Sequence, residues 1–325
     1  MHAIVLAGGY ATRLWPITRH RPKMLLPVGE RTVIGIILDA LEQEDRIDDV
    51  YVSTNEAFAE TFDSYLEDSE YGKAQLSIEE TTAESEKFGV IGALAQLVER
   101  EELTEETLVI AGDNLISFDI SEFLDAFDAA GEPTLAAYDV GSYERAGEYG
   151  LVELNDDGEV TDFQEKPDAP NSTLVSVACY GFPSETLPKL QDYLAADNNP
   201  DEPGWFIKWL QQRETVQAFC FDEAWFDIGT PASYLDAVAW YLDGDNYVHP
   251  DADVETAQLD GNAQVLADAT VEDATIADSV VFPEATVVNS NVRRSLIDTA
   301  TDLEALDLSG AVIGAHTTLN GNRNS

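Results

Sequence analysis

Two hydrophobic patterns alternate along the first 240 residues. Short continuous apolar runs predict buried strands, and the stretches between them place their apolar residues on one face of a helix. The strands are predicted at 3–7, 50–54, 76–79, 107–111, 134–140, 174–182 and 216–221, and the clearest helices at 33–41, 90–98 and 123–127. This alternation predicts an α/β fold with a mostly parallel sheet and helices on both faces. Ligands of such sheets bind beyond the carboxyl ends of the strands.

A different pattern begins at about residue 247. Branched apolar residues recur every five or six positions, with small residues between them, at Val248, Val254, Leu259, Val265, Val271, Ile276, Val281, Val287, Val292, Ile297, Leu303, Leu308, Ile313 and Leu319. This spacing is typical of the hexapeptide-like repeats of a β-helix, here of roughly four coils. An ordinary antiparallel sheet is the alternative, but the spacing persists over all fourteen of these residues. We therefore expect two domains, 1–244 and 245–325.

The surface of the protein is expected to be strongly acidic, because the 325 residues carry a net charge of −46. Chains this acidic are often disordered, but 44% hydrophobic and 9% aromatic residues favour a folded core. A carboxylate-rich, lysine-poor surface is expected of a halophilic protein, since salt near 1 M shortens the Debye length to about 3 Å. Nucleic acid and anionic membranes are not expected as partners of such a surface.

The two cysteines, Cys179 and Cys220, are too few for a disulfide framework. Both lie in apolar, strand-like runs, which predicts buried free thiols. No charged segment precedes a long apolar stretch at the N-terminus, and no apolar run reaches the roughly 18 residues of a membrane span. We therefore expect a cytoplasmic protein.

Basic residues are concentrated near the N-terminus, just after the first predicted strand. Five of the seventeen lie in the first tenth of the chain, at Arg13, Arg19, Arg21, Lys23 and Arg31. The Gly8-Gly9 turn before them lets backbone N–H groups approach an anion, while an arginine fork and a lysine point charge can grip phosphate oxygens. Chance clustering on a solvated loop is the alternative. Neither a P-loop nor a dinucleotide-binding glycine motif occurs. The segment indicates a polyphosphate site of another kind.

The same segment carries a recognisable motif, Leu6-Ala7-Gly8-Gly9-Tyr10-Ala11-Thr12-Arg13-Leu14-Trp15-Pro16 followed by Pro22-Lys23-Met24-Leu25-Leu26-Pro27. It resembles the signature of sugar-1-phosphate nucleotidyltransferases, above all the long-form glucose-1-phosphate thymidylyltransferases and their uridylyltransferase relatives. Ala11 stands where the family usually has glycine, and a positive φ would strain an alanine. The resemblance covers nearly the whole chain, and it implies a Rossmann-like sheet followed by a short left-handed β-helix.

The implied reaction moves a nucleotidyl group from an NTP, with dTTP or UTP favoured, to a sugar-1-phosphate, with glucose-1-phosphate favoured. Arg13 and Lys23 would be catalytic, and the products would be an NDP-sugar and pyrophosphate. The nucleotide would be bound by Leu6, Gly8, Gly9, Thr12, Arg13, Glu80 and Gly112. Glu80 lies in a loop, residues 79–93, that departs from the family's base-reading pattern, so the sequence leaves the base open.

Two aspartates are candidates for Mg²⁺, which favours carboxylate, phosphate and water oxygens. Asp113 follows the buried run 107–111 and a glycine, and Asp227 lies between apolar residues just before a helix predicted near Pro231. A surface position for Asp113 and a turn or helix-capping role for Asp227 are the alternatives. Both segments resemble the family's metal-aspartate motifs, and the four histidines show no metal-pair spacing.

A hairpin turn at 155–158 predicts two projecting strands, the second ending in Glu165-Lys166-Pro167. The resemblance implies that Glu165 accepts hydrogen bonds from sugar hydroxyls and that Lys166 contacts the sugar-1-phosphate. Gly150 is expected to allow the backbone to approach the sugar closely. A surface ion pair is the alternative for Glu165 and Lys166.

Two other functions are compatible with this domain order. A non-catalytic regulatory or scaffold subunit would be expected to lack the arginine, lysine or aspartates that are present here. An acyltransferase in the β-helix would need a catalytic histidine, and His316 is expected to be structural. We expect the β-helix to serve packing or assembly, and the protein to be a homo-oligomer.

Overall fold

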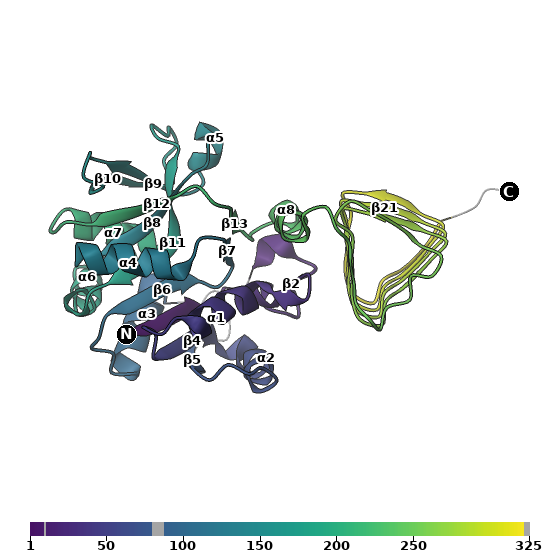
Figure 1. Ribbon diagram of the computed structural model, residues 1–325, viewed down its shortest axis with the longest axis horizontal. Helices are drawn as coiled ribbons and strands as arrows, with labels where there is room; N and C mark the ends of the chain where they lie inside the picture. Colours follow the sequence, from purple (N-terminus) through teal and green to yellow (C-terminus); the bar gives the residue numbers. More distant parts are fainter. Residues whose placement is uncertain (10, 80–87, 322–325) are drawn as a thin grey trace. The chain divides into compact units, whose positions relative to one another are not determined.

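The computed structural model describes residues 1–9, 11–79 and 88–321, which belong to two compact units (Figure 1). The first unit consists of Met1–Gly9 and Ile37–Trp225, and the second of Tyr10–Ile36 and Phe226–Ser325. The basic segment near the N-terminus therefore belongs to the same unit as the C-terminal repeats.

The described strands of the first unit form a nine-stranded sheet in the order β10-β9-β11-β6-β1-β4-β5, with β8 beside β11 and β12 beside β8. Strand β1 is parallel to β4 and β6, β4 is parallel to β5, and the long β11 runs antiparallel to its neighbours. The strands are β1 (His2–Leu6), β4 (Asp49–Asn55), β5 (Ala74–Glu79), β6 (Thr107–Ala111), β8 (Thr134–Asp139), β9 (Gly150–Leu154), β10 (Val160–Glu165), β11 (Leu174–Phe182) and β12 (Gln217–Phe221). The predicted α/β fold is confirmed.

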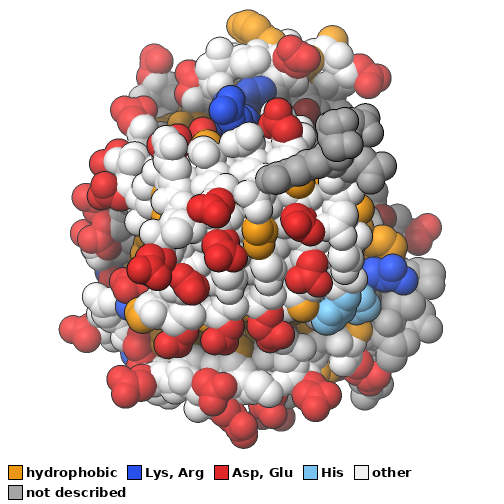
Figure 2. Space-filling view, turned by 90° about the vertical axis from the view of Figure 1, so that its right-hand side faces the viewer, with side chains coloured by type: hydrophobic (Ala, Val, Ile, Leu, Met, Phe, Trp, Pro, Cys, Tyr) orange, Lys and Arg blue, Asp and Glu red, His pale blue; other side chains and the backbone are white. Residues whose placement is uncertain are grey.

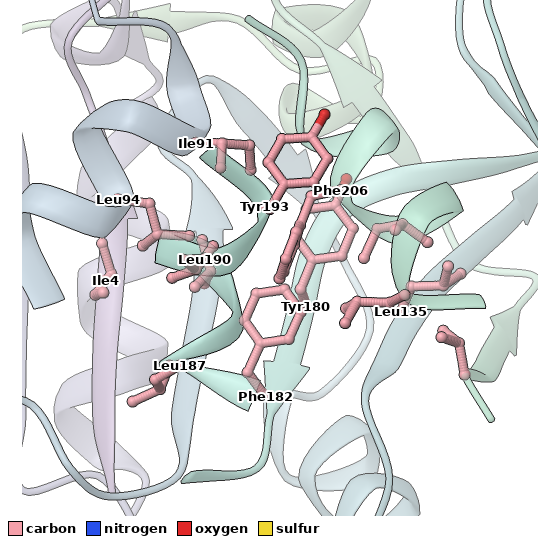
Figure 3. Close-up of a cluster of buried hydrophobic side chains, with 14 of the residues drawn as sticks. Ile4, Ile91, Leu94, Leu135, Tyr180, Phe182, Leu187, Leu190, Tyr193 and Phe206 are labelled. Carbon is pink, nitrogen blue, oxygen red and sulfur yellow. The ribbon is translucent and has the colours of Figure 1, made fainter. Parts of the chain in front are cut away.

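Helices cover both faces of this sheet. Figure 3 shows side chains of α3 (Val90–Arg100), α6 (Lys189–Ala195) and α7 (Pro203–Gln211) packed against Ile4, Tyr180 and Phe182 of the sheet. Gly181 lies between Tyr180 and Phe182 in β11. A Cβ atom added to it would lie 2.7 Å from the ring of Phe127 in α4 (Ile120–Ala130), so Gly181 faces this helix. Because successive strand residues point to opposite faces, α4 covers the other face. The remaining helices are α1 (Val33–Gln43), α2 (Glu56–Glu67), α5 (Tyr143–Ala146) and α8 (Pro231–Leu242).

Residues 247–320 form a triangular β-helix of three parallel sheets, as the repeat predicted (Figure 1). Gln264 pairs with Val280, Val280 with Leu296 and Leu296 with Val312, so one coil takes 16 residues. The first sheet contains β14 (Tyr247–Val248), β16 (Gln264–Val265), β19 (Val280–Val281), β22 (Leu296–Ile297) and β25 (Val312–Ile313). The second contains β15 (Gln258–Asp260), β18 (Thr275–Ala277), β21 (Asn291–Arg293) and β24 (Asp307–Ser309), and the third β17 (Thr270–Glu272), β20 (Thr286–Val288), β23 (Asp302–Glu304) and β26 (Thr318–Asn320). These strands fit the expected left-handed β-helix.

The corners of the β-helix use left-handed backbone. One corner places Asp268, Glu284, Ala300 and His316 at φ values of 58°, 61°, 52° and 58°. Aspartate tolerates this conformation better than most residues, because its short polar side chain hydrogen-bonds locally, whereas alanine has no such compensation. Most of the apolar residues at five- to six-residue spacing point inward and form the core, which includes Val271, Ile276 and Val287, whereas Leu319 in the last strand is 37% exposed.

The prediction for the cysteines is half wrong, because Cys179 is buried but Cys220 is exposed. Phe219 and Phe221, on either side of Cys220 in β12, both contact the ring of Phe118. Since alternate residues of a strand point to opposite faces, Cys220 points away from this aromatic cluster.

Acidic side chains are spread over the face shown in Figure 2, where few basic ones are visible. In the part of the chain that the structure describes, no helix is long and apolar enough to cross a membrane.

Candidate active site

The loop after β1 is held by the neighbouring strands at their carboxyl ends. The backbone N–H of Gly112, just after β6, donates to the carbonyl of Leu6 at 2.9 Å. On the other side, the buried Asn55 at the end of β4 donates from Nδ2 to the carbonyl of Gly8 at 2.7 Å. Leu6, Gly8, Gly112 and the half-buried Asp113 therefore lie at one edge of the sheet. This is the edge at which parallel sheets bind ligands.

A buried carboxyl at this edge was missed by the sequence reasoning. Glu79, the last residue of β5, is 8% exposed, and its Oε1 lies 3.4 Å from the point where a Cβ on Gly8 would be. Burial raises the pKa of Glu79, and the charge of Arg100 only partly opposes this. Its position at the end of the predicted strand 76–79 could have indicated that Glu79 lies at the ligand-binding edge of the sheet. The predicted base-facing residue, Glu80, lies outside the described residues.

Glu165 lies between two glycines that are distant in the sequence. A Cβ on Gly150 would lie 3.2 Å from Oε2 of Glu165, and a Cβ on Gly204, in the first turn of α7, would overlap this oxygen. The side chain of Glu165 is only 7% exposed. Burial raises the pKa of Glu165 to about 7, and the negative charge of Glu202 adds to this shift while the positive charge of Lys166 opposes it. Gly204 is a second residue that sequence reasoning missed.

Lys166 pairs with two neighbouring glutamates. Its Nζ donates to Glu202 and lies 3.9 Å from Oε1 of Glu165, while 48% of the side chain stays exposed. Its backbone has a left-handed φ of 43°, and its N–H donates to the carbonyl of Tyr149 at 3.1 Å. The ion pair between Glu165 and Lys166, given above as the alternative, is thus present.

In the second unit, Arg13 lies against the turn that carries Asp227. Ala11 has a left-handed φ of 48°, the conformation that strains an alanine, and it caps the short helix η1 (Thr12–Leu14), with Thr12 and Arg13 exposed. A Cβ on Gly229 would lie 2.9 Å from Nη2 of Arg13. The N–H of Gly229 donates to the carbonyl of Asp227 at 3.0 Å, and a capping box at Thr230 starts α8 directly afterwards.

Lys23 begins the short helix η2 (Lys23–Leu25) and is 9% exposed. The N–H of Leu26 donates to the carbonyl of Lys23 at 3.1 Å, and the N–H of Val33 donates to that of Leu26 at the same distance. The lysine backbone is thus fixed by the turn that follows it.

The carboxylates of Asp113 and Asp227 suit Mg²⁺ in their chemistry. Within the described ranges, no group of three or more His, Cys, Asp or Glu could hold a metal ion. Mg²⁺ does not need such a cage, because it is commonly bound through one or two carboxylates together with substrate phosphates and water.

Known proteins are similar in sequence to this chain over most of its length. A "Putative mannose-1-phosphate guanyltransferase" from Sulfolobus acidocaldarius is 31% identical over 234 residues, covering 72% of this chain and 61% of that protein. The "UTP--glucose-1-phosphate uridylyltransferase" of Synechocystis sp. is 27% identical over 252 residues, covering 74% of this chain and 63% of that protein. The chain therefore spans less than two thirds of the length of these two relatives. "Mannose-1-phosphate guanylyltransferase 1" of Arabidopsis thaliana is 26% identical over 98% of this chain and 87% of its own length.

The fold is also similar to that of a solved structure. A "Putative Glucose-1-Phosphate Thymidylyltransferase" from Bacillus anthracis superposes with a TM-score of 0.66 at 24% identity, covering 75% of this chain and 96% of that one. The family model described as "Nucleotidyl transferase" matches residues 2–244. This match includes both the glycine turn at the sheet edge and the Asp227 turn with its neighbouring arginine. The chain therefore belongs to the nucleotidyl transferase family.

Proposed function

We propose that the protein is a sugar-1-phosphate nucleotidyltransferase, which transfers a nucleotidyl group from an NTP to a sugar-1-phosphate and releases pyrophosphate. One observation carries the proposal. Arg13, which follows the Gly8-Gly9 turn by four residues, places its guanidinium against Gly229. In a chain with a net charge of −46, anionic substrates are repelled unless cations are concentrated at the site. The names of the aligned relatives support the same class of reaction.

The chain's own residues would act by positioning and by electrostatic stabilisation. In the proposed reaction, Gly8, Gly9 and Thr12 cradle the nucleotide. Arg13 and Lys23 neutralise charge on the triphosphate and on the departing pyrophosphate. A phosphate oxygen of the sugar-1-phosphate attacks the α-phosphorus directly, its new P–O bond replacing the bond to pyrophosphate, so that no covalent intermediate with the enzyme forms.

Asp113 and Asp227 would hold Mg²⁺ through their carboxylate oxygens. A bound Mg²⁺ supplies positive charge that screens the two polyanions from one another. On the sugar side, we assign hydroxyl binding to Glu165, with Gly150 and Gly204 leaving room beside its carboxyl group. The catalytic domain is proposed to be 1–244 and the β-helix domain 245–325.

Glucose-1-phosphate with dTTP or UTP is the proposed substrate pair. The aligned relatives carry guanylyl- and uridylyltransferase names, so the base has to be decided by experiment. The acidic surface leads us to propose that the enzyme works in concentrated salt (Figure 2). A cytoplasmic location and a homo-oligomeric state stay predictions.

The test is pyrophosphate release in high-KCl buffer with Mg²⁺, across five NTPs and several sugar-1-phosphates. We expect release with at least one pair, and a loss of about a hundredfold or more in turnover for Lys23→Ala and Asp227→Ala. Lys208→Ala, a change in α7, and Asp307→Ala, a change on the β-helix surface, are the matched controls and should keep wild-type turnover. Near-normal turnover in both site variants would refute the proposed site. Silence across all pairs, with folded protein that still binds nucleotide, would favour a regulatory subunit.

A further inference from the structure

One row of the β-helix is covered by the basic segment, which we define as residues 11–36. Phe282, Asp298 and Gly314 occupy equivalent positions, each directly after its strand in the first sheet of the β-helix. Each of them contacts the basic segment. A Cβ on Gly314 would lie 3.0 Å from the ring carbons of Pro16, and the guanidinium carbon of Arg21 lies 4.7 Å from the ring centroid of Phe282. The basic segment therefore crosses several coils of the β-helix.

Asp298 anchors this segment on one side of Lys23. Its Oδ1 accepts a hydrogen bond from Nη2 of Arg21 at 2.5 Å, and the same nitrogen donates to Oγ1 of Thr299 at 2.9 Å. The side chain of Asp298 is 3% exposed. Breaking a buried pair of this kind leaves one charge without its partner, so the position of Arg21 is strongly restrained.

Gln264 anchors the segment on the other side of Lys23. This residue is fully buried, and both ends of its amide are used. Oε1 accepts from the N–H of Gly29 at 2.7 Å, and Nε2 donates to the carbonyl of Pro27 at 3.0 Å. The hydroxyl of Tyr234 in α8 donates to the same carbonyl at 2.6 Å. Polar groups buried this deeply are costly to leave unpaired, so this contact also fixes the backbone.

We propose that this row of the β-helix positions the catalytic lysine, and that Gln264 and Asp298 are positioning residues for Lys23. The inference rests on the proposed function, because it assumes that Lys23 acts on the substrates. Anchors at Arg21 and at Pro27–Gly29 bracket Lys23 and its helix η2. The β-helix is then part of the catalytic apparatus, and this row of it is not free to bind another subunit.

The test compares Gln264→Leu and Asp298→Ala with wild type, using Asp307→Ala, an exposed change on β24, as control. We expect kcat to fall about tenfold or more in both variants at a temperature where they are folded, because small displacements of catalytic groups are costly. The KM for the sugar-1-phosphate should stay unchanged. Asp298→Asn, which keeps an acceptor oxygen, should retain more of kcat than Asp298→Ala.

A second readout does not depend on activity. Hydrogen exchange at the amide of Leu26, which donates to the carbonyl of Lys23, should become about tenfold faster in Gln264→Leu and Asp298→Ala but not in the control. Unchanged kcat or unchanged exchange in folded variants would overturn the inference. A silent wild-type enzyme would instead overturn the proposed function, and faster exchange would then still support the restraint on Lys23.

Discussion

Replacing the buried Glu165 by glutamine should stabilise the protein at alkaline pH. The carboxyl group of Glu165 lies against Gly150 and Gly204, where water is largely excluded. Burial and the charge of Glu202 raise its pKa to about 7 from the ordinary value of 4.5. Holding the ionised form in this place therefore costs folding free energy. Glutamine has nearly the same shape and carries no charge, so it removes that cost.

The size and the sign of the effect follow from proton linkage. Between 4.5 and about 7, the folded state keeps the proton of Glu165 while the unfolded state has lost it, so stability falls as the pH rises through this window. At about 1.4 kcal/mol for each pH unit, the full loss is about 3 kcal/mol above the folded pKa. The advantage of Glu165→Gln should therefore be below about 1 kcal/mol near pH 5 and about 3 kcal/mol near pH 8.

The assay is urea unfolding of wild type and Glu165→Gln at about pH 5 and about pH 8, in KCl of the same concentration. Glu148→Gln, which removes one carboxyl group at an exposed position outside this cluster, serves as the matched control. If the difference between Glu165→Gln and wild type is the same at both pH values, the desolvation argument is wrong.

Three further predictions concern the second unit and the surface. Gly229→Ala should lower kcat/KM for the NTP about tenfold or more with little change in the unfolding temperature, because the new Cβ would lie 2.9 Å from Nη2 of Arg13; normal kinetics would contradict this role. Ala300→Gly should raise the free energy of unfolding by about 0.5–1 kcal/mol in urea titrations, because glycine adopts the left-handed φ of 52° without strain and loses only part of this gain to backbone entropy. A less stable variant would show that Ala300 is not strained. The unfolding temperature should rise between about 0.1 M and about 1 M KCl, as screening weakens repulsion within a chain of net charge −46, and a temperature independent of salt would contradict this expectation.

Strands and helices were predicted well because their signals are local. The run at 107–111 is strand β6, and the helical face at 90–98 lies in α3. Cys220 was misjudged because an apolar run does not say which face of its strand is covered. That depends on the ring of Phe118, which comes from a distant part of the chain.

Within the candidate site, the sequence identified residues by type and order, and it missed their surroundings. Glu165 was predicted, but Gly204, beside its carboxyl group, looks like an ordinary residue near the start of a helix. Gln264 and Asp298 look like surface residues of a repeat, since polar residues there normally face water. Both are buried where the basic segment lies over them and hydrogen-bonds to their side chains.

By itself, the sequence determined the α/β order, the coils of the β-helix and the motif around Gly8-Gly9 that we propose binds phosphate. These features depend on the spacing of residues along the chain. The backbone geometry of strands and coils fixes which of those residues lie on the same face. Tertiary structure decided the burial and pKa of Glu165, the contact of Arg13 with Gly229 and the pairing of Arg21 with Asp298. Desolvation and pairing energies depend on which groups exclude water from a site. In this protein those groups come from distant segments, with Arg21 and Asp298 lying 277 residues apart in the chain, and only folding brings them together.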